Sequence, residues 1–158
     1  PVKLNMVVMR GINEGEVRDM LKKYSGEDVV LQLIELMNTD DEFFEKHFYS
    51  LDEIEREFEG EAKEVAVRKF MQGRRKYVLN GAQVEVVKPM HNTEFCANCT
   101  RIRITADGKF KPCLMRSDNL VDFLTPMRRE AGDKELEALL KEAMEKREPY
   151  FKKSLACP

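Results

Sequence analysis

The chain has 158 residues, and its 27 lysines and arginines nearly balance 29 aspartates and glutamates. This length suits one domain of ordinary size, and the charge balance excludes a polybasic nucleic-acid arm and an acidic tail. Because there is neither a signal peptide nor a run of the ~18 apolar residues that a membrane span needs, we expect a cytoplasmic protein without nucleic-acid or membrane partners. The sequence starts inside a predicted strand, so we expect a fragment of a longer protein.

The first 37 residues carry the pattern of a strand, a helix and a second strand. Residues 2–9 alternate between apolar and polar positions, which predicts a half-buried strand. Asn13 and Glu16 have capping-box spacing and precede an amphipathic helix over 17–24. Residues 29–36 form an apolar run typical of a buried strand. A strand–helix–strand order at this spacing predicts a βαβ unit with parallel strands.

The next segment is acidic and less regular. Residues 38–48 are expected to form a loop or a short helix. Ser50 and Glu53 form a second capping-box pattern that predicts the start of a helix. Residues 62–71 fit a helix and a strand equally well. This change of character predicts a boundary after residue 37, with 1–37 and 38–158 as separate regions.

Two pairs of an Asx residue and a glycine predict β-hairpins, because both central residues of a two-residue turn must adopt positive φ. A last amphipathic helix is expected after Asp133. The predicted fold class is therefore α/β for the first part of the chain and α+β for the rest: a βαβ unit, then antiparallel hairpins, then C-terminal helices. The hairpins are centred on Asn80-Gly81, between 76–79 and 83–87, and on Asp107-Gly108, between 101–105 and 109–114.

Three of the four cysteines have the spacing of a metal or cluster site, Cys96-x2-Cys99-x13-Cys113. If Asp107-Gly108 is a two-residue turn, Ile102 faces Cys113, which brings the third thiol near Cys99. A structural zinc site is closed by four protein ligands, whereas a [4Fe–4S] cluster bound by three cysteines leaves one iron without a protein ligand. Spacing alone does not choose between these two metals. The candidate fourth ligands are His91, Glu94 and Cys157.

Arg101 and Arg103 follow Cys99 directly and lie two residues apart on the predicted strand, so both side chains are expected on one side. Arginine is suited to bidentate contacts with phosphate and to stacking on a base. The simpler interpretation is a pair of solvated charges on an edge strand. Their position beside a metal site favours an anionic ligand.

The stretch 95–109, followed by Pro112-Cys113-Leu114, resembles the C-terminal cluster motif of molybdenum cofactor biosynthesis protein A, the radical-SAM GTP 3′,8-cyclase family. Residues 2–13 and 34–37 resemble late barrel strands of that family. The resemblance implies an incomplete TIM barrel closed by the cluster region. It also implies a lyase that rearranges GTP into a cyclised dihydroguanosine triphosphate in molybdenum cofactor biosynthesis.

The resemblance also implies roles for individual residues. Three thiols match the ligands of a second [4Fe–4S] cluster whose open iron binds the guanine. Lys3 matches a GTP-binding lysine, and Met37 matches a residue lining the S-adenosylmethionine site. The expected cofactors of the full-length protein are therefore the [4Fe–4S] cluster and S-adenosylmethionine. The implied cluster ligands are Cys96, Cys99 and Cys113, and the implied GTP contacts are Lys3, Arg101, Ile102 and Arg103.

Three departures from the family pattern limit these expectations. The C-x3-C-x2-C motif of the other cluster is absent, so the chain alone is expected to be inactive without the N-terminal radical-SAM half. Gln32 stands where bacterial members have a phosphate-binding arginine, and the chain ends Ala156-Cys157-Pro158 in place of a diglycine. The alternative is a non-catalytic zinc or iron–sulfur module for structure or electron transfer. The sequence does not decide whether the protein forms a homodimer.

Overall fold

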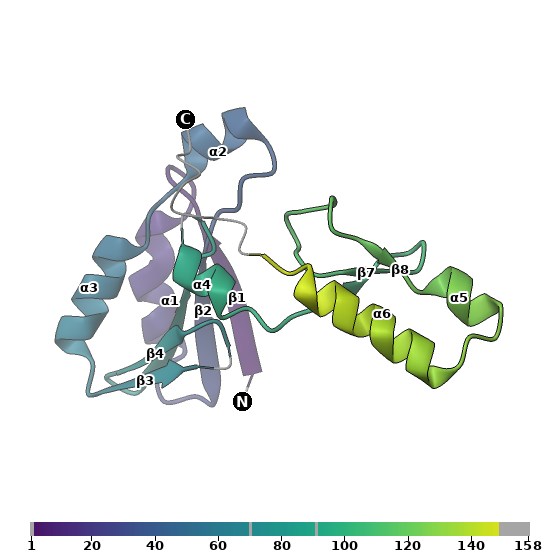
Figure 1. The fold of residues 1–158 in the computed structure, drawn as a ribbon. Helices are drawn as coiled ribbons and strands as arrows, with labels where there is room; N and C mark the ends of the chain where they lie inside the picture. Colours follow the sequence, from purple (N-terminus) through teal and green to yellow (C-terminus); the bar gives the residue numbers. More distant parts are fainter. Residues whose placement is uncertain (1, 70, 91, 149–158) are drawn as a thin grey trace. The chain divides into compact units, whose positions relative to one another are not determined.

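The computed structural model describes residues 2–69, 71–90 and 92–148, and the chain divides into two compact units, 1–98 and 99–158 (Figure 1). Each unit is described separately. The boundary predicted after residue 37 concerns a barrel in a longer protein and stays a prediction. Among the described helices, none has both the length and the apolar composition to cross a membrane.

The first unit is built on a five-stranded mixed sheet in the order β1-β2-β5-β4-β3. The predicted βαβ unit is confirmed, because β1 and β2 are parallel and helix α1 (Val17–Lys23) lies between them in sequence. β5 adds to β2 in parallel and carries β4 and β3 in antiparallel order. The strands are β1 (Val2–Val8), β2 (Val29–Glu35), β3 (Glu64–Arg68), β4 (Arg74–Leu79) and β5 (Ala82–Val87).

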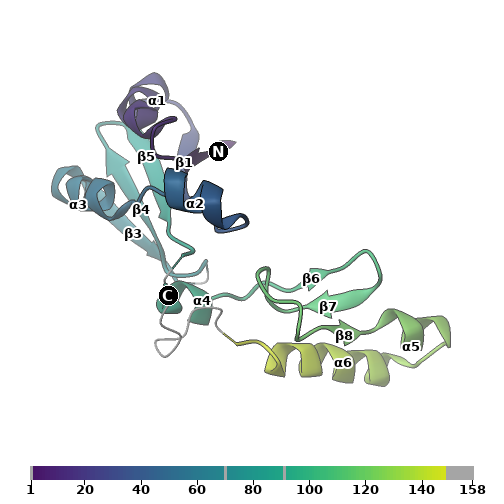
Figure 2. The same cartoon turned by 90° about the horizontal axis from the view of Figure 1, so that it is seen from above.

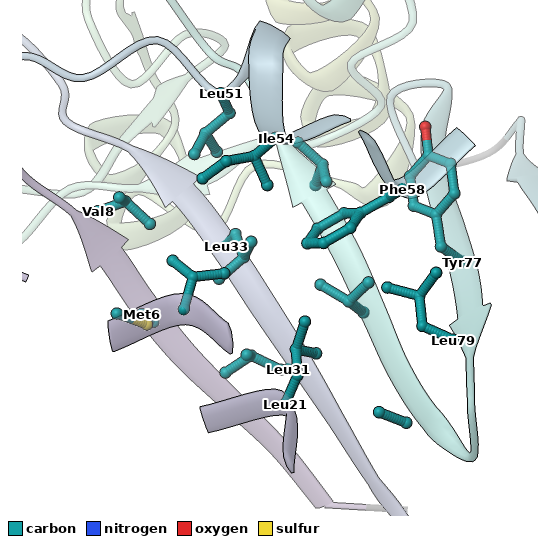
Figure 3. Packing of buried hydrophobic residues seen from close by; sticks show 14 residues of the cluster. Met6, Val8, Leu21, Leu31, Leu33, Leu51, Ile54, Phe58, Tyr77 and Leu79 are labelled. Atoms are coloured by element: carbon teal, nitrogen blue, oxygen red, sulfur yellow. The ribbon is translucent and has the colours of Figure 1, made fainter. Parts of the chain in front are cut away.

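One face of this sheet is covered by α1 and by α3 (Asp52–Glu61), and the core lies between them (Figure 3). Fourteen buried residues form this core, with Phe58 and Leu33 fully buried. The acidic segment forms a short helix, α2 (Asp41–His47), and the ambiguous segment is the strand β3. A short helix α4 (Thr93–Ala97) and the 3-10 turn η1 (Glu14–Glu16) complete the described elements of this unit.

The second unit has a small three-stranded antiparallel sheet in the order β6-β7-β8, against which α6 (Asp133–Glu145) packs (Figure 2). Phe110 and Phe123 stack with ring centroids 4.3 Å apart, and Val121 and Ala143 are buried beside this sheet. The remaining elements are β6 (Arg103–Ile104), β7 (Lys109–Lys111), β8 (Val121–Asp122) and α5 (Leu124–Arg128). Both predicted hairpins and the last helix are therefore present.

The register predicted for the second hairpin is wrong by one residue. Arg103 pairs with Lys111 and Ile104 with Phe110, so the loop contains three residues, 106–108, and not two. Gly108 alone in this loop has positive φ, at 76°, which is typical of a three-residue loop that ends in a glycine bulge. The predicted pairing of Ile102 with Cys113 is therefore absent. The Asn80-Gly81 hairpin has its predicted two-residue turn, with φ of 45° and 89°.

Both predicted capping boxes are also wrong. Asn13 makes no cap; its side chain instead accepts a hydrogen bond from Met9 N (2.8 Å) and donates one to Val7 O (2.9 Å). α3 begins at Asp52, one residue later than a Ser50 cap requires. The Ser50 hydroxyl donates to the Asp52 carboxylate at 3.0 Å. The Ser50 hydroxyl also accepts a hydrogen bond from the Asp52 amide at 3.3 Å, so it still meets the helix start. Among the described residues, neither predicted pair makes the two reciprocal contacts of a capping box.

Candidate functional site

The three predicted metal ligands lie on two different units. Cys96 is on α4 in the first unit, and Cys99 and Cys113 lie on irregular segments of the second. All three are free thiols, and all three are half-buried. The unit boundary thus falls within the C-x2-C motif.

The donor chemistry of these residues fits the implied iron–sulfur cluster, because three free, partly accessible thiols are what such a cluster requires. Within residues 2–69, 71–90 and 92–148, no three His, Cys, Asp or Glu side chains are gathered as a metal site. Of the candidate fourth ligands, Glu94 is exposed on α4, and His91 and Cys157 lie outside the described residues. The thiols are therefore identified by their chemistry, and their convergence stays a prediction.

A polar cavity of about 250 Å³ lies beside α4 in the first unit. The Arg74 guanidinium lies over the Phe95 ring at 5.8 Å from its centroid, so a cation and an aromatic side chain meet at the wall of this cavity. The lining also includes Glu55, Lys88, Asn92 and Glu94. The helix that carries Cys96 therefore borders a space that a small polar molecule could enter.

The two site arginines differ in their surroundings. Arg103 opens β6 opposite Lys111 and is half-buried, whereas Arg101 is exposed and precedes the strand. The predicted strand over 101–105 is thus shorter, and Ile102 lies half-buried between the two arginines. Neither guanidinium makes an ion pair with any residue in the described part of the chain. Both charges are therefore available to an anion.

The charged side chains at the turn of the same hairpin form an ion pair with each other. Lys109 pairs with Asp107 at 2.8 Å, and the Thr105 hydroxyl donates to the same carboxylate at 2.5 Å. These two contacts, the lysine first, lower the pKa of Asp107 to about 2. The carboxylate at this turn is therefore satisfied locally and does not need Arg101 or Arg103 as a partner.

Lys3, the predicted GTP-binding lysine, is held by a buried carboxylate that the sequence analysis missed. Its ammonium lies 2.7 Å from Glu85 Oε2, and Arg68 reaches Oε1 of the same carboxylate at 3.3 Å. The Glu85 side chain is fully buried, whereas the two cations are each 36% exposed. One anion thus orients two cations, from β1 and β3, and leaves a net positive charge on this face of the sheet.

Gln32 lies beside this ion-pair group. It pairs in register with Asn5 on one side and with Glu85 on the other, and it is only 7% exposed. In the described part of the chain, its side chain has no hydrogen-bond partner. The departure from an arginine at this position therefore places a neutral amide next to Glu85, where a cation would have been a third partner.

Lys3 and Met37 lie toward opposite ends of the β1–β2 pair. Lys3 is in register with Val30, and Met37 follows the end of β2 seven residues further along. At ~3.3 Å per strand residue the two positions are roughly 20 Å apart. The structure thus does not bring the predicted GTP lysine and the predicted S-adenosylmethionine residue together. Met37 is half-buried.

A buried glutamate near Met37 is the most perturbed carboxyl at the end of β2. Burial, the largest cause, raises the pKa of Glu35 to about 7, although the Leu51 amide donates to it at 3.1 Å. The nearby carboxylates of Asp52 and Glu55 raise this pKa further, and Lys88 lowers it. No sequence signal separated Glu35 from an exposed strand glutamate. Its contact with Leu51 joins β2 to the start of α3.

Comparison with known proteins identifies the family. The sequence model of the family described as Molybdenum Cofactor Synthesis C matches residues 29–153. A "Probable GTP 3',8-cyclase" of Methanothermobacter thermautotrophicus is 47% identical over 154 residues, which cover 96% of this chain and 50% of that protein. The proteins of the same name from Thermococcus kodakarensis and Pyrococcus abyssi are each 48% identical, with 96% of this chain and 52% of the relative covered.

The chain therefore spans about half the length of the curated relatives that it matches. The family model covers 29–153, which is well over half of the chain and includes all three thiols of the motif. On this evidence the chain belongs to the Molybdenum Cofactor Synthesis C family.

Proposed function

We propose that this chain is the C-terminal part of a GTP 3′,8-cyclase and contributes the GTP-binding cluster site of that enzyme. The observation that carries the proposal is the run from Cys96 to Cys113, in which three free thiols accompany two arginines that lack ion pairs in the described structure. The names of the relatives support the same activity for the full-length protein. In this proposal residues 1–37 complete a radical-SAM barrel, and 38–158 form the cluster and GTP-binding region.

In the proposed site, Cys96, Cys99 and Cys113 hold a [4Fe–4S] cluster. Such a cluster has one iron without a protein ligand, and this iron supplies a binding position for a substrate atom. Arg101 and Arg103 provide fixed positive charge for the base and phosphates of GTP, with the Ile102 backbone between them.

Lys3 adds a further cation in the proposal. Its ammonium is oriented by the buried Glu85 carboxylate, so little conformational freedom would be lost when an anion binds. Met37 would line the S-adenosylmethionine site at the other end of β2. Gln32 offers no positive charge, so we propose that the triphosphate is held by Lys3 and the arginines without a cation at that position.

The chain alone is proposed to lack catalytic activity. It contains no C-x3-C-x2-C motif, and Cys157, the one cysteine outside the three proposed ligands, cannot form one by itself. Cleavage of S-adenosylmethionine would therefore depend on the N-terminal half of the enzyme. The protein's own residues bind and orient GTP, while the radical chemistry comes from the cofactors.

The test is anaerobic reconstitution of the chain with iron and sulfide, followed by metal analysis. We expect about four irons per chain for this type of cluster. Cys113→Ser should lose most of the iron, and Cys157→Ser serves as the control that keeps it. One tightly bound zinc per chain without iron uptake would contradict the proposal and would favour a zinc module.

GTP binding is tested in the reconstituted full-length enzyme, because the absent half contributes to the site. Arg101→Ala and Arg103→Ala should each weaken GTP binding by ~1.5–3 kcal/mol, or about ten- to a hundredfold, and leave the iron content unchanged. Arg128→Ala, an exposed arginine of α5, is the matched control. Unchanged GTP affinity in both site variants would indicate an electron-transfer or structural iron–sulfur module.

A further inference from the structure

The end of α6 is fastened to the segment that joins Cys99 to the site arginines. Arg147, two residues beyond the helix, donates from Nη1 to the carbonyl oxygen of Cys99 at 2.6 Å. Its other terminal nitrogen, Nη2, donates to the carbonyl oxygen of Arg101 at 2.7 Å. One half-buried guanidinium thus holds two main-chain carbonyls of the same segment, and both contacts lie within the second unit.

This segment has little else to define its path. Residues 99–102 form neither helix nor strand, and the β6–β7 ladder begins only at Arg103. Arg147 supplies a hydrogen-bond donor to each of the two carbonyls, of which the contact at Cys99 is partly buried and the contact at Arg101 is exposed. The guanidinium therefore fixes the backbone at Cys99 and at Arg101, immediately before the ladder fixes Arg103.

The helix end that carries Arg147 is itself anchored. The Asn119 side chain donates to the carbonyl oxygen of Lys146 at 3.1 Å, and Arg116 pairs with Glu148 at 3.0 Å. Earlier in α6, Ala143 is fully buried where the helix packs against β7 and β8. The contacts of Arg147 therefore transmit the position of a packed helix to an irregular segment.

The chemistry of the guanidinium suits this task. Its planar fork can donate to two acceptors at once in fixed directions. A lysine ammonium could donate to both carbonyls only with a less defined geometry. Both terminal nitrogens of Arg147 are engaged by carbonyls, so this arginine holds the backbone and is not free to bind phosphate.

We propose that Arg147 is a positioning residue that fixes the backbone between the metal ligand Cys99 and the substrate-binding Arg101. The inference rests on the proposed function for the roles of Cys99 and Arg101, and on the observed contacts for everything else. By fixing this backbone, Arg147 sets the position of the Arg101 main chain, from which the guanidinium extends, relative to Cys99.

Hydrogen exchange measures the positioning without GTP or metal. In the full-length protein without reconstituted metal, Arg147→Met should speed exchange of the ladder amides at Arg103 and Thr105 by about tenfold or more, because the segment that leads into the ladder loses two charge-assisted hydrogen bonds. Arg147→Lys should give an intermediate rate. Arg129→Met, which removes an exposed arginine paired with Glu135 in the same unit, should leave these amides unchanged. Unchanged exchange in Arg147→Met would overturn the inference.

The functional consequence is measured in the reconstituted full-length enzyme. Arg147→Met should bind GTP about tenfold more weakly with the iron content of the unmodified enzyme, and Arg147→Lys should recover part of the affinity. Full GTP affinity in Arg147→Met, despite faster exchange, would overturn the positioning role. If Arg147→Met also loses iron, Arg147→Lys must recover both iron and affinity, or the role is merely structural. If the unmodified enzyme binds no GTP, the proposed function fails, and the exchange rates still decide whether Arg147 fixes the segment.

Discussion

The two units hold their candidate site cations in different ways. In the first unit, Lys3 projects from a sheet backed by a core of fourteen buried residues. The Lys3 ammonium forms an ion pair with the fully buried carboxylate of Glu85. In the second unit, Arg101 and Arg103 have no ion pair within the described residues, and the contacts of Arg147 hold the backbone at Cys99 and Arg101 instead. One unit orients the side chain, and the other orients the main chain.

The difference follows from the size of the two sheets, which have five strands in the first unit and three in the second. A carboxylate such as Glu85 can be buried only where a large sheet surrounds it and cations reach it from both sides. The second unit spans only residues 99–158 and has few buried apolar side chains, so it gains less from burial. Small units of this kind commonly depend on a metal or on polar contacts with the backbone. Metal binding at Cys99 and Cys113 would therefore stabilise the second unit more than the first.

The hairpin glycines offer the largest test of this contrast. A Cβ on Gly108 would overlap Cβ and Cδ2 of Leu124, and its φ of 76° is strained for any other residue. We expect Gly108→Ala to destabilise the second unit by about 2–4 kcal/mol, through backbone strain and overpacking together. Urea unfolding followed by hydrogen exchange in each unit would measure the loss.

Two other glycines calibrate the effect. At Gly81 a Cβ would meet the Ser25 hydroxyl at 3.1 Å, so Gly81→Ala should cost the first unit only ~1–2 kcal/mol, mainly through its φ of 89°. At Gly15 a Cβ would meet nothing within 4 Å, and Gly15→Ala should leave stability nearly unchanged. Equal losses of stability at Gly108 and Gly81 would show that Leu124 moves aside for the added methyl group at little cost.

The same two hairpins show how far local sequence determines structure. Both Asx-Gly pairs correctly predicted a hairpin, but only Asn80 adopts the positive φ of a two-residue turn. At the second hairpin, Gly108 O accepts hydrogen bonds from Phe123 N (3.3 Å) and Leu124 N (3.1 Å), and this contact with the following segment accompanies the three-residue loop. A contact some fifteen residues away in sequence is not encoded in the turn motif. Hairpin existence was therefore predictable, and register was not.

The candidate site divides in a similar way. The thiols of the Cys96 motif and the arginines after it were recognisable because their residue types and spacing carry the signal. Glu85 and Arg147 were missed because their partners lie 82 and 48 residues away in sequence, at Lys3 and Cys99. In sequence, Glu85 is a charged residue in an apolar strand, which normally indicates a solvated face. Its full burial depends on the β1–β2–β5 order, which no local pattern shows.

A double-mutant cycle between Lys3 and Glu85 tests whether the buried carboxylate orients the lysine. We expect Lys3→Met and Glu85→Gln to be coupled by about 1–3 kcal/mol in the free energy of unfolding, because each removes the partner of the other in a buried setting. The exposed pair of Lys141 and Glu137 on α6 is the control, with an expected coupling below ~0.5 kcal/mol. A coupling for Lys3 and Glu85 as small as the control would mean that Arg68 alone satisfies the carboxylate.

The smallest expected effect concerns pH and the first unit. Since the pKa of Glu35 is raised from an ordinary 4.5 to about 7, the folded protein keeps this proton over a pH range in which the unfolded chain has lost it. Stability contributed by the neutral carboxyl is therefore complete below pH 4.5 and is lost as the pH rises to about 7. Glu35→Gln keeps an acceptor for the Leu51 amide but cannot ionise, so it should be more stable than the unmodified chain by about 1–2 kcal/mol at pH 8 and equal to it at pH 4, after allowance for solvent screening. Urea unfolding at both values, with the exposed Glu45→Gln as control, measures the difference. A constant difference between the two proteins across this range would mean that burial at the end of β2 does not raise the pKa of Glu35.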